Sequence, residues 1–193
     1  MTARESILAA IRGAKPGIIA KPEVRGAVAR FSDHGNLVAR FTASAELAGA
    51  QVVRGSRAAL PSLISAAHPD RGRRVSVLDT LESGDADPHS FADTDVFVCE
   101  GVIGVAENGA VWLPLSRLRH RSAVFLAANV IIVLDQARIV AGFHEAYEAV
   151  DMAADGFGVF MAGPSKTADI EQSLVVGAHG PKSLTIVLLD ETA

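Results

Sequence analysis

The fold is most clearly indicated by residues 157–189, which read FGVFMAGPSKTADIEQSLVVGAHGPKSLTIVLL. The two ends of this stretch, residues 157–162 and 184–189, are rich in Val, Ile, Leu and Phe and predict buried strands. The polar residues between them have little reason to lie in a core. Because α/β sheets place ligands at the carboxyl ends of strands, this polar insert predicts a binding site at such an end.

The residues predicted to bind a small anion in the insert share backbone freedom or a polar side chain: Gly163, Ser165, Lys166, Thr167, Asp169, Glu171 and Gly180. Gly163 lets the chain leave its strand with dihedral angles closed to other residues, and Lys166 supplies a positive charge. Asp169 has N-cap spacing for a helix that runs to Gly177, and a helix N-terminus attracts anions. The insert lacks the spacing of a phosphate loop, so nucleotide binding is not predicted.

The same residues allow a structural interpretation. The hydroxyl groups and Asp169 would cap a turn, while Lys166 would pair with the carboxylate of Asp169 or Glu171. His179 is a candidate catalytic proton carrier near neutral pH, or a side chain that only hydrogen-bonds the turn. The sequence leaves these alternatives open.

Apolar runs outside the insert predict further strands at residues 51–53, 75–78, 96–105 and 129–134. Asn108 and Gly109 tolerate positive φ and precede the apolar run 111–113, which predicts an antiparallel hairpin. Helical patterns alternate with the strands. We therefore expect one α/β domain over residues 1–193, with three layers and a mainly parallel sheet of about seven strands that contains the hairpin.

Four helices outside the insert are indicated by caps and apolar faces. Thr2 and Glu5 have capping-box spacing for an opening helix, and residues 33–48 carry apolar side chains on one face. Pro61 fits the first turn of a third helix, and residues 142–154 predict an amphipathic fourth. Residues 1–48 are expected to form a helical extension at the N-terminus of the domain.

Composition limits the classes of function. A chain of 193 residues with 49% hydrophobic residues can bury one sizeable core. A net charge of −4, from 18 basic and 22 acidic residues, gives no electrostatic reason to bind nucleic acid or an anionic membrane. The opening apolar stretch, residues 7–11, is too short for a signal peptide or a membrane span. We expect a cytoplasmic protein.

Cys99 is the sole cysteine of the sequence. A single cysteine excludes an internal disulfide and suits a reducing compartment. An iron–sulfur cluster needs several thiolate ligands, so no such cofactor is expected in this chain, and any cluster in its pathway belongs to a partner. Cys99 follows the apolar run 96–98, which favours burial over a reactive thiol.

Two motifs resemble the lactate-utilisation protein C family, whose domain is called the LUD domain. The first is the run 163–181, and the second is Ala106-Glu107-Asn108-Gly109. The resemblance extends over about residues 95–189, although the family usually has threonine where this chain has Asn108. It implies a fold similar to the sugar-phosphate isomerase and CoA-transferase group, whose members bind anionic metabolites at strand ends.

The resemblance also implies a function. Members of the family are associated with a three-component system that oxidises L-lactate to pyruvate, in which other subunits carry the iron–sulfur centres. We therefore expect a lactate-utilisation component with iron–sulfur partner proteins, which either organises the system or contributes a small-anion site. Formation of a homo-oligomer is compatible with this role. The alternative is a stand-alone enzyme that acts on a phosphorylated or CoA-linked small metabolite.

Glu107 is a second catalytic candidate. In the wider fold group a glutamate is the nucleophile of CoA transferases, and Glu100 or Glu107 would be its counterpart here. The local sequence lacks that enzyme signature, and the ordinary role of Glu107 beside Asn108 is that of a solvated turn residue.

Three other polar clusters favour solvated surfaces over sites. The first is a basic patch of Arg117, Arg119, His120 and Arg121, which would otherwise meet an anion or an acidic partner. The second, residues 85–89, offers oxygen and imidazole ligands, but Pro88 opposes metal coordination. The third, formed by His144, Glu145 and Glu148, does not complete a zinc motif. No metal site is predicted in this chain.

Overall fold

The computed structural model describes residues 2–15, 17, 20, 35–69, 72–78, 87–118, 120–170 and 173–190. The chain divides into two compact units, Met1–Ser32 and Asp33–Ala193. In the smaller unit, α1 (Ala3–Gly13) begins with the predicted capping box, because Glu5 N donates to Thr2 Oγ1 at 3.3 Å and Thr2 N donates to Glu5 Oε2 at 2.7 Å. The elements described next belong to the larger unit.

The strands are β1 (Gln51–Gly55), β2 (Arg73–Ser76), β3 (Thr94–Glu100), β4 (Ile103–Val105), β5 (Ala110–Pro114), β6 (Asn129–Asp135), β7 (Ile139–Val140), β8 (Gly158–Met161), β9 (Lys166–Ile170), β10 (Ser173–Val176) and β11 (Ser183–Leu189). The α-helices are α3 (Leu37–Leu47), α4 (Leu60–Ala67), α5 (Ala123–Leu126), α6 (Phe143–Ala149) and α7 (Met152–Asp155). Short 3-10 helices link some of them: η1 (Arg57–Ala59), η2 (Pro88–Phe91), η3 (Leu115–Arg117) and η4 (Gln136–Arg138).

The central sheet has five strands in the order β1-β11-β6-β3-β2, and all of its neighbouring strands run parallel. In β6, Ile132 faces one hydrophobic cluster, while Ile131 and Val133 face the other. Side chains of a strand alternate between faces, so burial on both faces requires an apolar residue at each position. The predicted α/β class with a mainly parallel sheet is confirmed.

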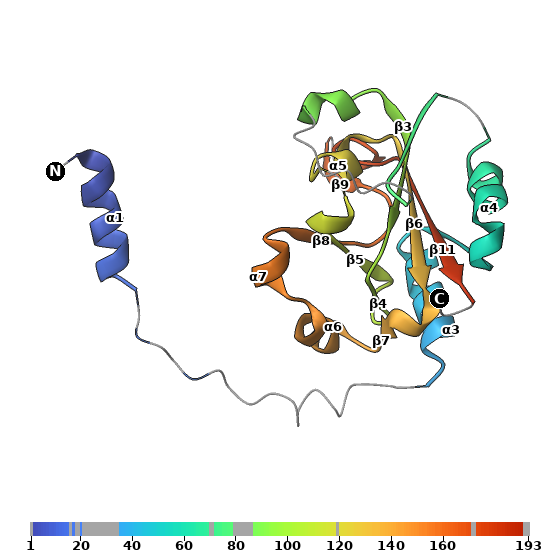
Figure 1. Cartoon of the computed structure of the whole chain (residues 1–193), viewed down its shortest axis with the longest axis horizontal. Helices are drawn as coiled ribbons and strands as arrows, with labels where there is room; N and C mark the ends of the chain where they lie inside the picture. The colour runs from blue at the N-terminus through green and yellow to red at the C-terminus, as the bar shows by residue number, and fades with distance from the viewer. Residues whose placement is uncertain are drawn as a thin grey trace. The chain divides into compact units, whose positions relative to one another are not determined.

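Different elements cover the two faces of the central sheet (Figure 1). α4 packs on one face through Leu60 and Ile64, and Pro61 stands in its first turn as predicted. α3 packs on the other face through Phe41 and Ala45, which are fully buried. The helical extension expected over residues 1–48 therefore overlaps the core of the larger unit along α3.

A second sheet, in the order β7-β4-β5-β8, covers the same face as α3. Its strands β4 and β5 form the predicted antiparallel hairpin, and β8 pairs with β5. The expectation of one sheet with about seven strands is therefore wrong. A Cβ atom at Gly104 would lie 2.7 Å from Leu134 Cδ2, and one at Gly101 would lie 2.3 Å from Val111 Cγ1. Glycine at both positions lets the chain leave β3 and fold closely over the central sheet.

The helix expected over residues 142–154 is interrupted between α6 and α7. Asp151 Oδ1 accepts hydrogen bonds from Ala153 N at 3.0 Å and Ala154 N at 3.1 Å, so it caps a new helix start. Such a side chain competes with continuation of the preceding helix. α3 begins after its N-cap, Asn36, while residues 33 and 34, where the prediction began, lie outside the described residues.

Cys99 is fully buried in β3, in the cluster between the central sheet and α3, as the sequence predicts. Burial, with a further contribution from the charge of Glu100, raises the pKa of the Cys99 thiol far above its ordinary value. The thiolate is therefore scarce in the native state at neutral pH. Thiol reagents need the thiolate and access to it.

We expect native protein to resist alkylation by iodoacetamide at pH 7.5, because Cys99 is both protonated and covered. The measurement is intact-mass spectrometry over time, with the same reaction in denaturant as the control. Rapid alkylation of the native protein, at the rate of the denatured control, would contradict the buried position of Cys99.

Candidate functional site

The hairpin tip between β4 and β5, residues 106–109, is fixed on the last turn of α3. Gly109 has a φ of +72°, and a Cβ atom there would lie 2.3 Å from Ala45 N. Ser44 Oγ donates a hydrogen bond to Ala106 O at 2.9 Å. The tip therefore packs directly on the helix backbone, and only glycine at position 109 permits this approach.

Glu107, an exposed residue of this tip, contacts the start of α6. Its Oε2 accepts a hydrogen bond from Phe143 N at 3.1 Å. The first N–H groups of a helix have no partner within the helix, and a carboxylate satisfies them while complementing the helix dipole. The geometry thus gives Glu107 a capping role, and a catalytic role for it stays a prediction.

The predicted anion-binding loop begins after β8 and also contacts the end of α3. Gly163 has a φ of +70°, and a Cβ atom there would lie 2.0 Å from Ala48 O. Lys166 Nζ donates a hydrogen bond to the same Ala48 carbonyl. Ser165 N donates to Pro181 O at 2.9 Å, which ties this loop to the loop that holds His179.

The turn at residues 177–180 completes this group of loops. Gly177 N donates to Ser165 O at 2.8 Å, and a Cβ atom at Gly180 would lie 3.1 Å from Ser165 Cβ. His179 is exposed within this turn. The structure therefore brings together Gly163, Ser165, Gly180 and the His179 turn, and places the Glu107 hairpin at the same end of α3.

The helix expected from Asp169 to Gly177 is wrong. Residues 166–170 and 173–176 form an antiparallel pair, β9 and β10, in which Thr167 pairs with Val175. β-branched residues such as Thr167, Ile170 and Val175 favour strands, and here this preference prevails over the N-cap spacing. Among the described residues of the loop, no helix begins that could attract an anion. Glu171 and the Asp169 side chain lie outside the described residues.

The insert follows the carboxyl end of β8, but it lies at the amino ends of the central strands. Ala48, which contacts Gly163, comes shortly before β1. Pro181, which bonds Ser165 N, comes shortly before β11, and Lys182 N donates to Ala128 O just before β6. The predicted position at the carboxyl end of a strand is therefore confirmed for β8, but β8 belongs to the second sheet, so the insert does not lie at the ligand-binding ends of the parallel strands.

The carboxyl ends of the parallel strands hold a different group of charged residues. Arg54 of β1 donates to Asp190 Oδ1 from Nε at 3.0 Å and from Nη2 at 2.9 Å. Arg54 Nη2 also donates to Gln136 Oε1 at 3.0 Å, and Gln136 Nε2 donates to Asp190 O at 2.9 Å. These bonds join the ends of β1, β11 and β6 in one polar network.

Glu100, the last residue of β3, lies between two arginines at this edge. Arg117 Nη1 lies 2.7 Å from Glu100 Oε2, and Arg57 Nη2 lies 3.5 Å from Glu100 Oε1. The side chains of Arg57 and Arg117 are 54% and 45% exposed, and that of Glu100 is 32% exposed. Two arginines thus share one carboxylate where α/β sheets place ligands.

The structure divides the basic patch that was predicted to be solvated, which consists of Arg117, Arg119, His120 and Arg121. Arg117 pairs with Glu100, whereas the His120 ring stacks on Phe91 with centroids 6.1 Å apart. Arg121 is exposed, and residue 119 lies outside the described residues. Arg57 is not among the site residues predicted from the sequence, although its position just after a predicted strand is a usable signal.

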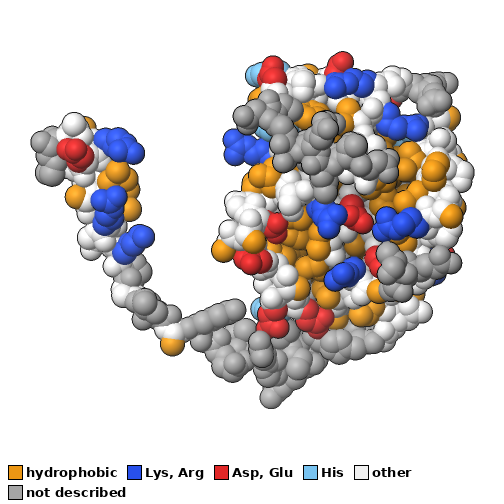
Figure 2. Space-filling model, viewed as in Figure 1, with side chains coloured by type: hydrophobic (Ala, Val, Ile, Leu, Met, Phe, Trp, Pro, Cys, Tyr) orange, Lys and Arg blue, Asp and Glu red, His pale blue; other side chains and the backbone are white. Residues whose placement is uncertain are grey.

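Charge on the visible face of the larger unit is mixed. Figure 2 shows basic and acidic side chains interspersed there, with apolar atoms between them. Within the described ranges, no group of three or more His, Cys, Asp or Glu side chains is arranged to hold a metal ion. None of the helices in those ranges is long and apolar enough to cross a bilayer. In the polar cluster at residues 85–89, Asp87 Oδ1 accepts a hydrogen bond from His89 N at 2.9 Å, so Asp87 caps η2.

A family model described as the LUD domain matches residues 57–189. Similar curated proteins include Lactate utilization protein C from Bacillus licheniformis, 29% identical over 138 residues, and Lactate utilization protein C from Bacillus subtilis, 30% identical over 138 residues. Each alignment covers 68% of this chain and 57% of the relative, so the chain spans little more than half the length of these proteins. A crystal structure of a DUF162 family protein from Deinococcus radiodurans has a similar fold, with a TM-score of 0.58 at 16% identity, covering 79% of this chain and 96% of that chain.

Replacement of Gly109 by alanine tests the contact between the hairpin and α3. Gly109→Ala is expected to lower the free energy of unfolding by about 3 kcal/mol, because a left-handed φ and a clash with the Ala45 backbone both oppose a Cβ atom. Gly156→Ala is the control, since φ is +64° there and nothing lies within 4 Å of the added atom. It should cost about 1 kcal/mol. Equal losses in urea titrations would contradict the close approach.

Lys166→Ala tests whether the loop after β8 has a structural or a binding role. Loss of the exposed hydrogen bond to Ala48 O is expected to lower the free energy of unfolding by at most about 1 kcal/mol. Lys182→Ala removes an equal charge and keeps its backbone bond to Ala128 O, so it is the control. Unchanged melting of Lys166→Ala, with weaker binding of phosphate in calorimetry, would instead support the anion site predicted from the sequence.

Proposed function

Because this chain belongs to the LUD domain family, we propose that it is a component of a cytoplasmic lactate-utilisation system. The proposal is supported by the family match over residues 57–189 and by relatives that carry the name Lactate utilization protein C. In this proposal the system oxidises L-lactate to pyruvate. The chain contributes a small-anion site, or organises the partner proteins that carry out the oxidation.

The small-anion site is proposed at the carboxyl edge of the central sheet, around Arg57 and Arg117. Glu100 pairs with Arg117 at 2.7 Å and with Arg57 at the longer distance of 3.5 Å, so in this proposal Arg57 exchanges the longer pair for an incoming carboxylate. Arginine binds a carboxylate through two parallel hydrogen bonds. Both guanidinium groups are about half exposed, so a small acid can reach them, and the expected affinity is modest.

Iron–sulfur clusters are proposed only in partner proteins. This chain has a single cysteine, Cys99, and that thiol is buried. A cluster needs several accessible thiolate ligands. The electrons removed from lactate would therefore pass to cofactors of the partners, and this chain would bind substrate or hold the partners together.

A second function is favoured by the position of Glu100. Its carboxylate stands at the carboxyl end of β3 between two arginines, which would hold an anionic substrate beside it. A stand-alone enzyme acting on a phosphorylated or CoA-linked metabolite would use Glu100 as nucleophile or base. Turnover by the isolated chain, lost in Glu100→Gln, would favour this second function.

The lactate proposal is tested by calorimetric titration of the purified chain with lactate and pyruvate. Arg117→Gln is expected to weaken binding about tenfold, as loss of one charge-assisted hydrogen bond does. Arg54→Gln is the matched control, because Arg54 is held by Asp190 and Gln136 and should not contact the acid.

A native pull-down with mass spectrometry tests the partners. Recovery of cysteine-rich iron–sulfur proteins would support the component role. Equal lactate binding by wild type and Arg117→Gln, together with an isolated chain in the pull-down, would contradict the proposal.

A further inference from the structure

α1, the helix of the smaller unit, carries an apolar stripe that is open to solvent. None of the residues Ala3–Gly13 is buried, and the large side chains of Ile7 and Ile11 are 60% and 55% exposed. These two residues lie one turn apart, so with Leu8 they form one apolar stripe along the helix. A helix of 11 residues is marginal by itself in water, and its stability comes mainly from packing of such a stripe. We therefore expect α1 to pack against an apolar surface.

The charge beside this stripe is basic. Arg4 and Arg12 of α1 are exposed, and Figure 2 shows basic and apolar side chains together along the helix. Glu5, the acidic residue of α1, accepts the Thr2 N–H group in the capping box. A surface complementary to α1 is therefore apolar and carries carboxylates at its rim.

An apolar surface of this kind is formed by α6 and β8 of the larger unit. Tyr147 of α6 is 62% exposed, and its ring centroid lies 6.0 Å from that of Phe143 and 5.5 Å from that of Phe160. The buried ring of Trp112 lies 4.7 Å from that of Phe160 and packs on the backbone of Gly158, where a Cβ atom would lie 2.2 Å from Trp112 Cζ2. We call these four aromatic residues the α6–β8 surface. Tyrosine and tryptophan are enriched at protein interfaces.

The segment that contains α6 and β8 is acidic. Residues 139–165 contain no Lys or Arg, and their acidic residues are Glu145, Glu148, Asp151 and Asp155. Asp151 Oδ1 accepts from two backbone N–H groups at the start of α7, and Asp155 Oδ1 accepts from Ser116 Oγ at 3.3 Å. These donors are neutral groups and leave the charge of both aspartates in place. Arg40 of α3 reaches the segment through a bond to the carbonyl of Ala141 at 3.3 Å, so carboxylates outnumber cations there.

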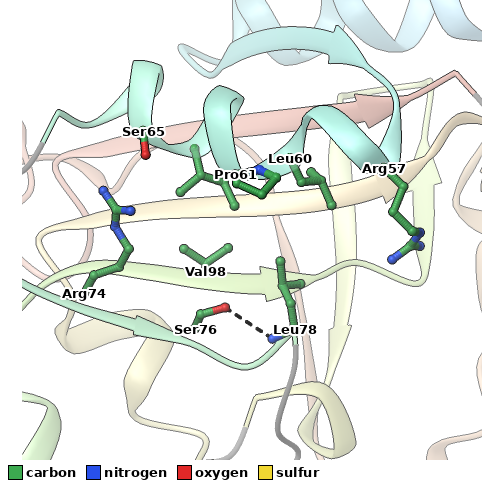
Figure 3. Close-up of a pocket in the computed structure, with 9 residues that line it drawn as sticks. Arg57, Leu60, Pro61, Ser65, Arg74, Ser76, Leu78 and Val98 are labelled. Carbon is green, nitrogen blue, oxygen red and sulfur yellow. Dashed lines mark hydrogen bonds between the residues drawn. The ribbon is translucent and has the colours of Figure 1, made fainter.

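A pocket of about 430 Å³ between α4 and the strands β2 and β3 is a second partly apolar hollow of the larger unit (Figure 3). Its apolar lining includes Leu60, Ile64 and Val98. Its charged lining residues, Arg57 and Arg74, lie toward opposite ends in Figure 3. None of the described residues that line it is acidic, so the arginines of α1 would find no carboxylate there. The α6–β8 surface is therefore the better match for α1.

We infer that α1 of one copy of this chain docks through Ile7, Leu8 and Ile11 on the α6–β8 surface of a second copy, with its arginines toward the acidic segment. The exchange is reciprocal, so the assembly is a two-fold dimer with two identical contacts. Two α6–β8 surfaces do not suit each other, because their carboxylates would meet. The contact uses neither Arg57 nor Arg117, so it goes beyond the proposed lactate site and does not depend on it.

The test is the oligomeric state of the full chain, measured by analytical ultracentrifugation over a concentration series at low and high salt. Wild-type protein is expected to dimerise, and more weakly at high salt because the ion pairs of the contact are screened. Ile7→Gln and Tyr147→Gln should each weaken the dimer at least about tenfold, since each removes a large apolar side chain from both contacts. Wild-type protein that stays monomeric at low salt would overturn the inference.

Matched controls place glutamine on the opposite side of the same two helices. Ala9 lies about 200° around α1 from Ile7, and Ala149 lies about 200° around α6 from Tyr147. Both alanines are exposed. Ala9→Gln and Ala149→Gln should dimerise as wild type does, and thermal melts of all four variants check that the fold is retained. Equal weakening of the dimer in variants and controls would count against docking through these faces.

Mixing the two deficient variants tests whether the occupant is a second copy. The Ile7→Gln chain keeps its α6–β8 surface, and the Tyr147→Gln chain keeps its α1. The mixture should form a one-to-one complex through one intact contact, with a change in the emission of Trp112, the sole tryptophan of the sequence. Absence of a complex in the mixture would reject the exchange. Dimerisation of Tyr147→Gln at wild-type strength would also reject it, because α1 would then pair elsewhere.

Discussion

Burial of the central strands on both faces is the constraint on which the rest of the structure depends. β6 and β11 lie between α4 on one side and α3 with the second sheet on the other, so positions 130–134 and 184–189 are apolar except for Thr185, which is itself buried. A polar side chain inside these strands would lose its hydration without a partner. Charged side chains of these two strands are therefore confined to the strand ends.

The amino and carboxyl ends of the parallel strands, called here the amino and carboxyl edges of the sheet, differ in how their polar groups are satisfied. At the amino edge, Lys166 Nζ donates to Ala48 O and Ser165 N donates to Pro181 O, so an incoming anion must displace contacts that hold loops together. At the carboxyl edge, Arg57 and Arg117 share one carboxylate and are about half exposed. This contrast supports the proposed anion site at the carboxyl ends, because an anion there would compete with side-chain contacts and would disrupt no backbone contact.

Close backbone approaches join the second sheet to α3. Gly109 packs on Ala45, and Gly163 packs on Ala48, so both motifs that resemble the LUD family rest on one helix end. These motif glycines thus have a packing reason that holds whether or not the loops bind a ligand.

The sequence by itself determined the buried strands, the Asn108–Gly109 hairpin, the Thr2–Glu5 capping box and the burial of Cys99, because each depends on neighbours in the chain. It did not determine which sheet β8 joins, or that residues 166–176 pair as strands. The meeting of Arg57, Glu100 and Arg117 was equally hidden, since residues far apart in the chain are brought together by the strand order. Only the tertiary structure decided which strand ends bring two arginines to one carboxylate, because strand order and sheet membership depend on long-range packing that no local pattern encodes.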